Sequence, residues 1–308
     1  MLAQAQQSLQ SNAPIPTWFG VGGRADRLAR PNDLEELTEM VRHAADKGHR
    51  VRVLGDGANL LVDDDGVDGL VLSLERLGRV ERPDPRDPGL LRVGAGANLM
   101  RLIADTVRDG LAGLETLAGI PATLGGALVM NAGGAFGQMA DCVEHVLAVT
   151  HEGEPVSLPR AAIDFGYRHS GLERYIVTGA DLRLKPADDP AALRERLKEI
   201  MAYKKGTQPM ADRSAGCVFK NPTMPDGQRV SAGMLIDKAG LKGVARGAAQ
   251  VSPVHANFFV TRQGACARDV IRLIGQIRRQ VLDHHGVLLE PEIAIWTRTG
   301  LTWEEIAA

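Results

Sequence analysis

Apolar positions along the chain follow two alternating periods, and the helical period first appears clearly at residues 32–48. Asn32 is the expected N-cap of this helix, with Glu35 three residues later, and the helix should end at Lys47 and Gly48. The apolar side chains fall on one helical face: Leu34, Leu37, Met40, Val41 and Ala44. We expect a surface helix that buries this face.

Short β-branched runs alternate with further helical stretches after residue 50. Strands are predicted in VRVLGDG, LVLSL, LLRVGAGA and YIVTGADLRLK, and a helix in NLMRLIADTVRDG. The segment VLAVTHEGEPVSL predicts a hairpin whose turn lies at Glu152 and Gly153. The first half of the chain therefore mixes strands and helices.

The last third repeats this mixture on a smaller scale. A helix is predicted after Pro190, in AALRERLKEIMAYKKG, with these residues inward: Leu193, Leu197, Ile200 and Met201. A longer helix in ARDVIRLIGQIRRQVLDHHG ends at Gly286 and carries the apolar stripe Val270, Ile271, Ile274, Ile277 and Val281. The strand VLLEPEIAIW follows. This pattern predicts an α+β protein of two lobes, divided near KPADDP into residues 1–188 and 189–308.

Composition and charge exclude several classes of protein. The 308 residues are 44% hydrophobic and 24% charged, proportions typical of globular proteins. The chain has 36 basic and 38 acidic side chains, so its net charge is −2. Because this balance gives no strongly basic surface, we expect no nucleic-acid partner. No stretch reaches the roughly 20 apolar residues of a membrane helix, and the start of the chain lacks a signal-peptide pattern. We therefore expect a cytoplasmic protein without a membrane partner.

Two kinds of candidate chemistry remain, the cysteines and the glycine clusters. Cys142, Cys217 and Cys266 are far apart and form no C-x-x-C pair, so we expect free thiols and no metal site. Glycines cluster in GVGGRAD, LGDGANLL, VGAGANLM and AGIPATLGGALVMNAGG, and neither G-x-G-x-x-G nor a P-loop is completed. These clusters are either tight turns between packed strands or main-chain loops that hold a diphosphate.

Seven segments in register resemble the UDP-N-acetylenolpyruvoylglucosamine reductase family. They are PTWFGVGGRAD, VLGDGANLLVDDDGVDGLVL, AGIPATLGGALVMNAGG, FGYRHSGL, AGCVFKNP, SAGMLIDKAGLKGVARGAAQVSPVHANFFV and GVLLEPEIAIW. The resemblance implies a two-subdomain FAD lobe of the vanillyl-alcohol-oxidase type (about 1–75 and 76–188) and a C-terminal substrate lobe (189–308). It also implies non-covalent FAD, NADPH as reductant and a UDP-sugar enolpyruvyl ether as substrate, reduced to UDP-N-acetylmuramate for peptidoglycan.

The FAD-binding residues implied by the resemblance lie in two glycine-rich segments. They are Gly55, Asp56, Gly57, Ala58, Asn59 and Leu60 in the first, and Gly119, Ile120, Pro121, Gly125, Gly126, Asn131 and Ala132 in the second. Ala58 departs from the serine that is usual in the family. The loss of this hydroxyl donor would weaken FAD binding by about 0.5–1.5 kcal/mol where water does not replace it.

Three catalytic residues are implied. Arg168 would hold the substrate carboxylate, because a guanidinium fork fits it. Glu292, which alternation places on the same face as Glu290 roughly 6.6 Å away, would polarise the enol. Cys217 stands where the family usually has serine and would supply the proton, since a thiol is a stronger acid than a hydroxyl. Without the resemblance these would be an ion pair, two solvated carboxylates and an inert buried thiol.

The resemblance also implies substrate contacts: Tyr167, Lys204, Lys205, Lys220, Asn221, Lys242 and His255. The interval between Arg168 and Cys217 is short, as in the family branch that lacks an extra tyrosine-bearing loop, and we expect a monomer. Two alternatives stay open: a flavin oxidoreductase of the same fold with another substrate, and a flavin- or nucleotide-binding module without turnover.

Overall fold

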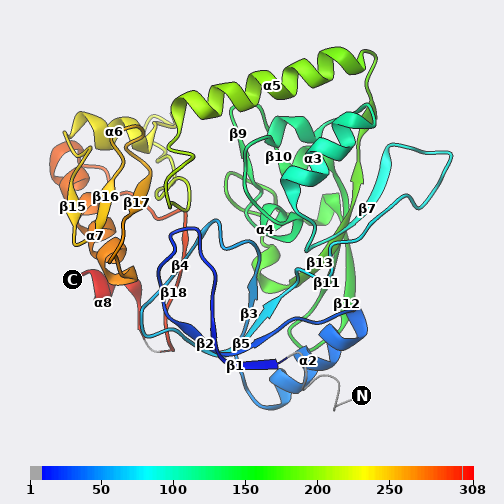
Figure 1. Ribbon diagram of the computed structural model, residues 1–308, viewed down its shortest axis with the longest axis horizontal. Coiled ribbons are helices and arrows are strands. Elements are labelled where there is room, and N and C mark those ends of the chain that lie inside the picture. The colour runs from blue at the N-terminus through cyan, green and yellow to red at the C-terminus, as the bar shows by residue number, and fades with distance from the viewer. Residues whose placement is uncertain (1–8, 300) are drawn as a thin grey trace. The chain divides into compact units, whose positions relative to one another are not determined.

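The computed structural model describes residues 9–299 and 301–308 and divides into two compact units (Figure 1). Of the described residues, the first unit contains 9–11, 27–56 and 69–204. The second contains residues 12–26, 57–68 and 205–308. The predicted cut at residue 188 concerns the cofactor and substrate lobes and stays a prediction. No single cut separates the two compact units, because residues 12–26 and 57–68 belong to the second unit although they lie in the N-terminal part of the chain.

A five-stranded antiparallel sheet organises the first unit, in the order β12-β11-β13-β7-β6 (Figure 1). The strands are β6 (Val80–Glu81), β7 (Leu90–Gly94), β11 (Val143–Val149), β12 (Pro155–Pro159) and β13 (Ile176–Arg183). The hairpin β11–β12 turns at Gly153, whose φ of 85° suits glycine. The predicted hairpin is therefore confirmed.

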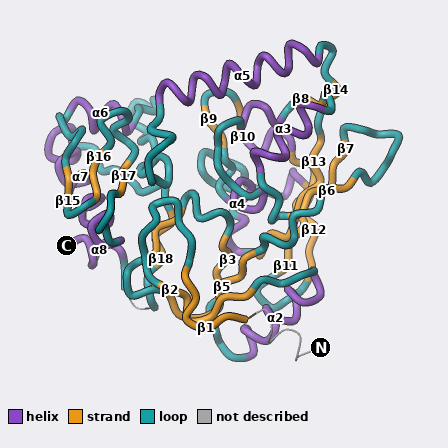
Figure 2. The backbone as a smooth tube through the Cα atoms, viewed as in Figure 1, coloured by secondary structure: helices purple, strands orange, loops and turns teal. Residues whose placement is uncertain are grey.

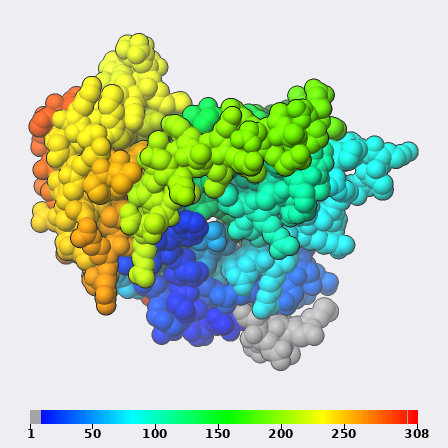
Figure 3. All heavy atoms as spheres, turned by 45° about the horizontal axis from the view of Figure 1, so that its top comes forward, coloured from blue at the N-terminus to red at the C-terminus, as the bar shows by residue number. Residues whose placement is uncertain are grey.

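Helices cover this sheet and bury the first core. They are α2 (Leu34–Asp46), α3 (Leu99–Arg108), α4 (Leu124–Val129) and α5 (Pro190–Thr207), the last ending in the second unit. Leu37 and Val41 of α2 and Ile103 of α3 are fully or almost fully buried in one cluster with the sheet. Figure 3 shows α5 in light green along the surface, where most of its side chains are exposed.

The remaining elements of this part of the chain are short. A four-stranded sheet has the order β1-β2-β5-β3, with β1 (Leu9–Pro14), β2 (Arg24–Ala29), β3 (Val51–Leu54) and β5 (Val67–Ser73). Two-stranded pairs join β8 (Leu111–Ala112) to β14 (Lys185–Pro186) and β9 (Gly133–Gly134) to β10 (Gly137–Gln138). Single 3-10 turns lie at Leu114–Leu117, Met139–Cys142, Arg160–Ala162 and Leu172–Arg174.

The second unit is built around α7 (Ala267–His285). Its buried stripe includes Val270, Ile274 and Ile277, and Gly286 ends it in the left-handed conformation, as predicted. The other elements are α6 (Ala232–Lys238), α8 (Trp303–Ala307), the antiparallel sheet of β15 (Ala245–Arg246), β16 (Ala249–Val251) and β17 (Phe259–Thr261), and the parallel pair of β4 (Leu60–Val62) with β18 (Ala294–Trp296). Figure 2 shows the segment 208–231 as loop.

Three sequence predictions need correction. Asp33, not Asn32, caps α2, since its carboxylate accepts the Glu36 N–H at 2.8 Å. Leu34 is 47% exposed because it precedes the buried face. The strand predicted at 287–296 is limited to β18. Residues 287–293 form no continuous ladder, since their pairing is limited to an isolated bridge between Pro291 and Phe219.

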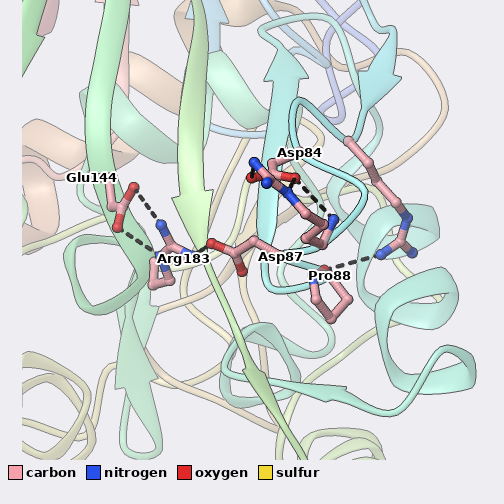
Figure 4. Close-up of polar contacts among 7 residues, drawn as sticks. Asp84, Asp87, Pro88, Glu144 and Arg183 are labelled. Atoms are coloured by element: carbon pink, nitrogen blue, oxygen red, sulfur yellow. Dashed lines mark hydrogen bonds and ion pairs between the residues drawn. The ribbon is translucent and has the colours of Figure 1, made fainter.

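Arg183, at the end of β13, binds two carboxylates (Figure 4). Its Nε lies 2.7 Å from Glu144 of β11, and its guanidinium also contacts Asp87 in the loop between β6 and β7. These carboxylates raise the pKa of the Arg183 guanidinium. The pair of contacts holds that loop against the sheet.

No helix among the described residues is both long enough and apolar enough to cross a bilayer.

Candidate functional site

The glycines of one cluster, VGAGANLM, serve close packing. A Cβ on Gly94 would lie 2.1 Å from the Leu77 carbonyl oxygen, and one on Gly96 would lie 1.9 Å from the Leu74 oxygen. The glycines of VGAGANLM therefore allow two backbone segments to approach, which is the tight-turn reading of this cluster.

A different arrangement surrounds Thr123, the N-cap of α4. Its Oγ1 accepts the Gly126 N–H at 3.3 Å, and a Cβ on Gly55 would lie 2.8 Å from the same oxygen. Gly55 and Gly126 are exposed, and a Cβ on Gly126 would meet only this oxygen, at 3.6 Å. The three residues form an exposed main-chain edge with one hydroxyl. Such an edge fits the phosphates and polar groups of a dinucleotide cofactor.

The other predicted cofactor residues of the first unit lie around α4. Ile120, Pro121 and Gly125 are half-buried, and Gly125 donates its N–H to the Ala95 oxygen at 2.9 Å. Asn131 is 2% exposed and has a φ of 39°. Ala132, beside it, donates its N–H to Ala127 at 2.8 Å. These residues form the wall behind the exposed edge.

Asn131 also fixes the turn that carries Arg168. Its Nδ2 donates to the Gly166 oxygen at 2.8 Å. Gly166 and His169 pair across the turn, and Arg168 adopts a φ of 54° between them. The Arg168 guanidinium lies 5.3 Å from the centre of the Tyr167 ring. A half-buried cation is thus held in a left-handed conformation that costs energy outside glycine.

Lys204 supplies a second cation near Arg168 in the first unit. The side chain is 8% exposed and packs on Gly119, where a Cβ would lie 2.7 Å from the Lys204 Cδ. Burial, and to a smaller extent the positive charge of Arg168, together lower the pKa of Lys204 to about 8. The neighbouring Lys205, assigned to the second unit, is exposed. Arg168 and Lys204 together form an anion-binding environment.

The predicted cofactor segment 55–60 continues into the second unit at Gly57. A Cβ on Gly57 would lie 2.2 Å from the Pro16 oxygen, and Leu60 is buried in β4. Asn59 donates its Nδ2 to the Glu292 oxygen at 3.3 Å and accepts the Ala294 N–H at 3.0 Å. Ala58 is half-buried between them. In this structure the Asn59 side chain therefore contacts the segment that carries Glu292.

Cys217 begins an extended segment that lies between two others far away in the sequence. On one edge Cys217 pairs with Phe258, and Val218 donates to the Asn257 oxygen at 2.8 Å. On the other edge the Val218 oxygen accepts the Glu292 N–H at 2.7 Å. The second unit thereby brings together Cys217, the 255–258 segment and Glu292, which are three of its predicted site regions.

The two glutamates of LEPE differ in their surroundings. Glu290 has a 73% exposed side chain and an ion pair with Lys220 at 3.7 Å. Glu292 is half-buried, next to the Cys217 segment. Because Glu292 is the less exposed of the two, this difference favours Glu292 over Glu290 as the candidate acid.

The remaining predicted substrate contacts surround this segment. Asn221 accepts the Ala232 N–H at 3.0 Å at the start of α6. His255 accepts the Asn257 N–H through Nδ1 at 3.2 Å, and its ring packs edge to face against Phe258. Burial lowers the pKa of the His255 ring, and the charge of Lys242 lowers it further, against a backbone hydrogen bond that raises it. Lys242 contacts Asp237 at 2.8 Å.

Thr123 and Asn257 are two candidate site residues that sequence reasoning did not single out. Thr123 stands at the N-cap of α4, before the Leu-Gly-Gly of the second glycine segment, and that position was readable as a capping signal. Asn257 follows His255 in VHANFF, with no local pattern that indicates its contacts.

The three cysteines are free, and their environments differ. Burial raises the pKa of the Cys142 thiol to about 12, and it also raises that of Cys266. Cys217 is half-buried. Within the ranges that the structure describes, no group of His, Cys, Asp or Glu side chains could hold a metal ion.

Two family models match the chain. Residues 25–159 match the FAD binding domain, and residues 208–296 match the C-terminal domain of UDP-N-acetylenolpyruvoylglucosamine reductase. The predicted fold class, an FAD-binding domain followed by a second α+β domain, is therefore confirmed, as is FAD as the cofactor.

Individual relatives match over nearly the full length. The UDP-N-acetylenolpyruvoylglucosamine reductase of Desulfosudis oleivorans is 41% identical over 289 residues, which cover 91% of each chain. That of Gloeobacter violaceus is 38% identical over 93% of this chain and 95% of its own. The crystal structure of the reductase from Thermus caldophilus superposes with a TM-score of 0.76 at 39% identity, over 91% of this chain and 95% of that one. The chain therefore belongs to the UDP-N-acetylenolpyruvoylglucosamine reductase family of flavin-dependent oxidoreductases.

Proposed function

We propose that this chain uses NADPH to reduce UDP-N-acetylglucosamine enolpyruvate to UDP-N-acetylmuramate, with Cys217 as the proton donor. The observation that carries the proposal is the extended segment at Cys217, held between the 255–258 segment and Glu292. That arrangement joins an acidic thiol, a carboxyl group and a histidine in one unit. The family membership supplies the reaction class, a reduction in peptidoglycan precursor synthesis.

FAD would be held without a covalent bond, with Gly55, Thr123 and Gly126 as the main-chain edge and Asn131 with Ala132 behind it. The chemistry supplied by bound FAD would be hydride transfer from NADPH to the enolpyruvyl double bond.

Each catalytic side chain then has one task in the substrate half-reaction. Arg168 binds the substrate carboxylate, on which negative charge grows as hydride reaches the terminal carbon of the enolpyruvyl double bond. Glu292 stabilises the enol form through a hydrogen bond. Cys217 transfers its S–H proton to the carbanionic carbon and recovers one from solvent afterwards. The balance is one hydride and one proton added across the double bond.

Basic and amide side chains would hold the rest of the substrate. In the first unit Tyr167 and Lys204 accompany Arg168, and the low pKa of Lys204 makes its charge responsive to a bound diphosphate. The contacts expected from the second unit are Lys205, Lys220, Asn221, Lys242 and His255. His255 is largely neutral near pH 7, since its pKa is lowered, and it can act as a hydrogen-bond partner.

Three finer points belong to the same proposal. The chain acts as a monomer in the cytoplasm, and it represents the family branch without the extra tyrosine loop. Size-exclusion chromatography with light scattering tests the first point, and a dimer mass at micromolar concentration would overturn it.

A steady-state experiment in heavy water tests the reaction. With NADPH in D2O, the product should carry a solvent-derived deuterium on the carbon that receives the proton. NADPH oxidation that does not depend on the UDP-sugar, with no reduced product in the mass spectrum, would contradict the proposed function.

A further inference from the structure

Asn257 makes a set of contacts that no assigned role explains. Its side chain is buried, with the residue 2% exposed, and it binds both main-chain groups of Phe219. Oδ1 accepts the Phe219 N–H at 2.9 Å, and Nδ2 donates to the Phe219 oxygen at 2.8 Å. The amide is oriented unambiguously, since an N–H needs an acceptor and a carbonyl needs a donor.

These contacts fix the segment that follows Cys217. The main-chain oxygen of Asn257 also accepts the Val218 N–H at 2.8 Å, so one residue holds three main-chain groups of Val218 and Phe219. On the opposite edge, the main-chain N–H of Glu292 donates to the Val218 oxygen at 2.7 Å. The main chain is therefore held from both sides immediately after the thiol.

The residue before Cys217 gives no comparable restraint. Gly216 has a φ of 78°, and a Cβ there would meet no heavy atom within 4 Å. A glycine in open space can change its dihedral angles at little cost. The direction of the Cys217 side chain therefore depends on the anchored side of the segment.

We propose that Asn257 is a positioning residue for the Cys217 thiol in the substrate half-reaction. The inference rests on the proposed function, because it assigns Cys217 a proton to deliver. Proton transfer needs the donor within hydrogen-bond reach of the reacting carbon, and a displacement of about 1 Å can cost on the order of 10²-fold in rate. Asn257 acts through the main chain and contacts no reacting atom.

The first test compares half-reactions of the FAD-loaded protein by stopped flow. Asn257→Ala should leave NADPH-driven flavin reduction within about twofold of wild type and slow flavin reoxidation by the enolpyruvyl substrate by about 10- to 100-fold. Thr261→Val is a matched control. It removes a buried hydroxyl that donates to Phe19 in the same unit, away from residues 217–219, and should change neither half-reaction.

A second variant separates positioning from folding. Asn257→Asp keeps an acceptor for the Phe219 N–H, and only its protonated form can donate to the Phe219 oxygen. Its reoxidation rate should therefore rise toward wild type as the pH falls, with no such rise in Asn257→Ala. A flat pH profile for the aspartate variant at a reduced rate would overturn the proposal.

A double-mutant cycle decides whether the effect passes through the thiol. In the Cys217→Ala background, Asn257→Asp should slow reoxidation no further. Additive losses would show that Asn257 acts elsewhere. Wild-type protein that never reoxidises would instead refute the proposed function, whereas wild-type turnover with unaffected Asn257 variants would refute this inference alone.

Discussion

Cys217 combines a half-buried thiol with a main chain held on two edges. A half-buried, positioned sulfur contrasts with Cys142, which burial makes a very weak acid. The sequence motif placed Cys217 in a catalytic segment, but the contacts that restrain it come from residues about 40 and 75 positions away. Long-range pairing of this kind leaves no local pattern, which explains why Asn257 was not foreseen.

Removal of the thiol should affect one half-reaction only. Cys217→Ala should leave flavin reduction by NADPH intact and slow the substrate half-reaction by on the order of 10²-fold or more, because the proton donor is lost. Cys217→Ser should recover part of the rate. Stopped-flow absorbance measures both steps, and equal wild-type and alanine rates in the second step would mean that another group supplies the proton.

The low pKa of Lys204 predicts a pH dependence of substrate binding. Below about pH 8 the buried ammonium is charged and attracts the diphosphate, whereas above it the charge is lost and the KM for the UDP-sugar should rise. Lys204→Met should have a raised KM without that rise near pH 8. Lys198→Met, an exposed position on the same helix, should follow wild type.

The same pKa affects folding with a definite sign. Between about pH 8 and the ordinary value of 10.5, the unfolded chain binds more protons at this position than the folded one. The contribution of Lys204 to stability therefore becomes more favourable as the pH rises through this window, opposite to its effect on binding. Above pH 8, wild type should gain stability relative to Lys204→Met while its affinity for the UDP-sugar falls, as measured by denaturation and KM series on both proteins. A loss of stability relative to Lys204→Met in this window would contradict the assignment.

At the scale of elements, the helical and strand periods predicted most of what forms. The buried faces of α2 and α7 and the β11–β12 hairpin agree with the periods because each is fixed by nearby residues. The strand after α7 is shorter than its alternation predicts, because a ladder needs a continuous partner strand and residues 287–293 make only one isolated bridge. The cap of α2 was placed one residue early, since Asn32 and Asp33 are both good capping types.

Asp33 should carry the capping energy of α2. Asp33→Ala should lower the free energy of unfolding by about 1 kcal/mol, because the Glu36 N–H loses its acceptor, and Asp33→Ser should lower it by much less. Urea denaturation followed by circular dichroism measures the difference. An alanine variant as stable as the serine variant would show that the cap contributes nothing here.

At the scale of the whole molecule, each of the two compact units carries its own set of predicted site residues. Arg168, Lys204 and the exposed edge at Thr123 belong to the first, and Cys217, His255 and Glu292 belong to the second. The sequence could assign the segments to two lobes through the family resemblance. The sequence does not predict that residues 12–26 and 57–68 belong to the second unit, because that depends on long-range pairings such as β4 with β18.

The most direct test of the account is an anaerobic cycle on the FAD-loaded protein. NADPH should bleach the visible flavin absorbance, and the enolpyruvyl UDP-sugar should then restore it rapidly in wild type and slowly in Cys217→Ala. Bleaching without recovery in wild type would contradict the proposed reaction and leave Cys217 an inert thiol.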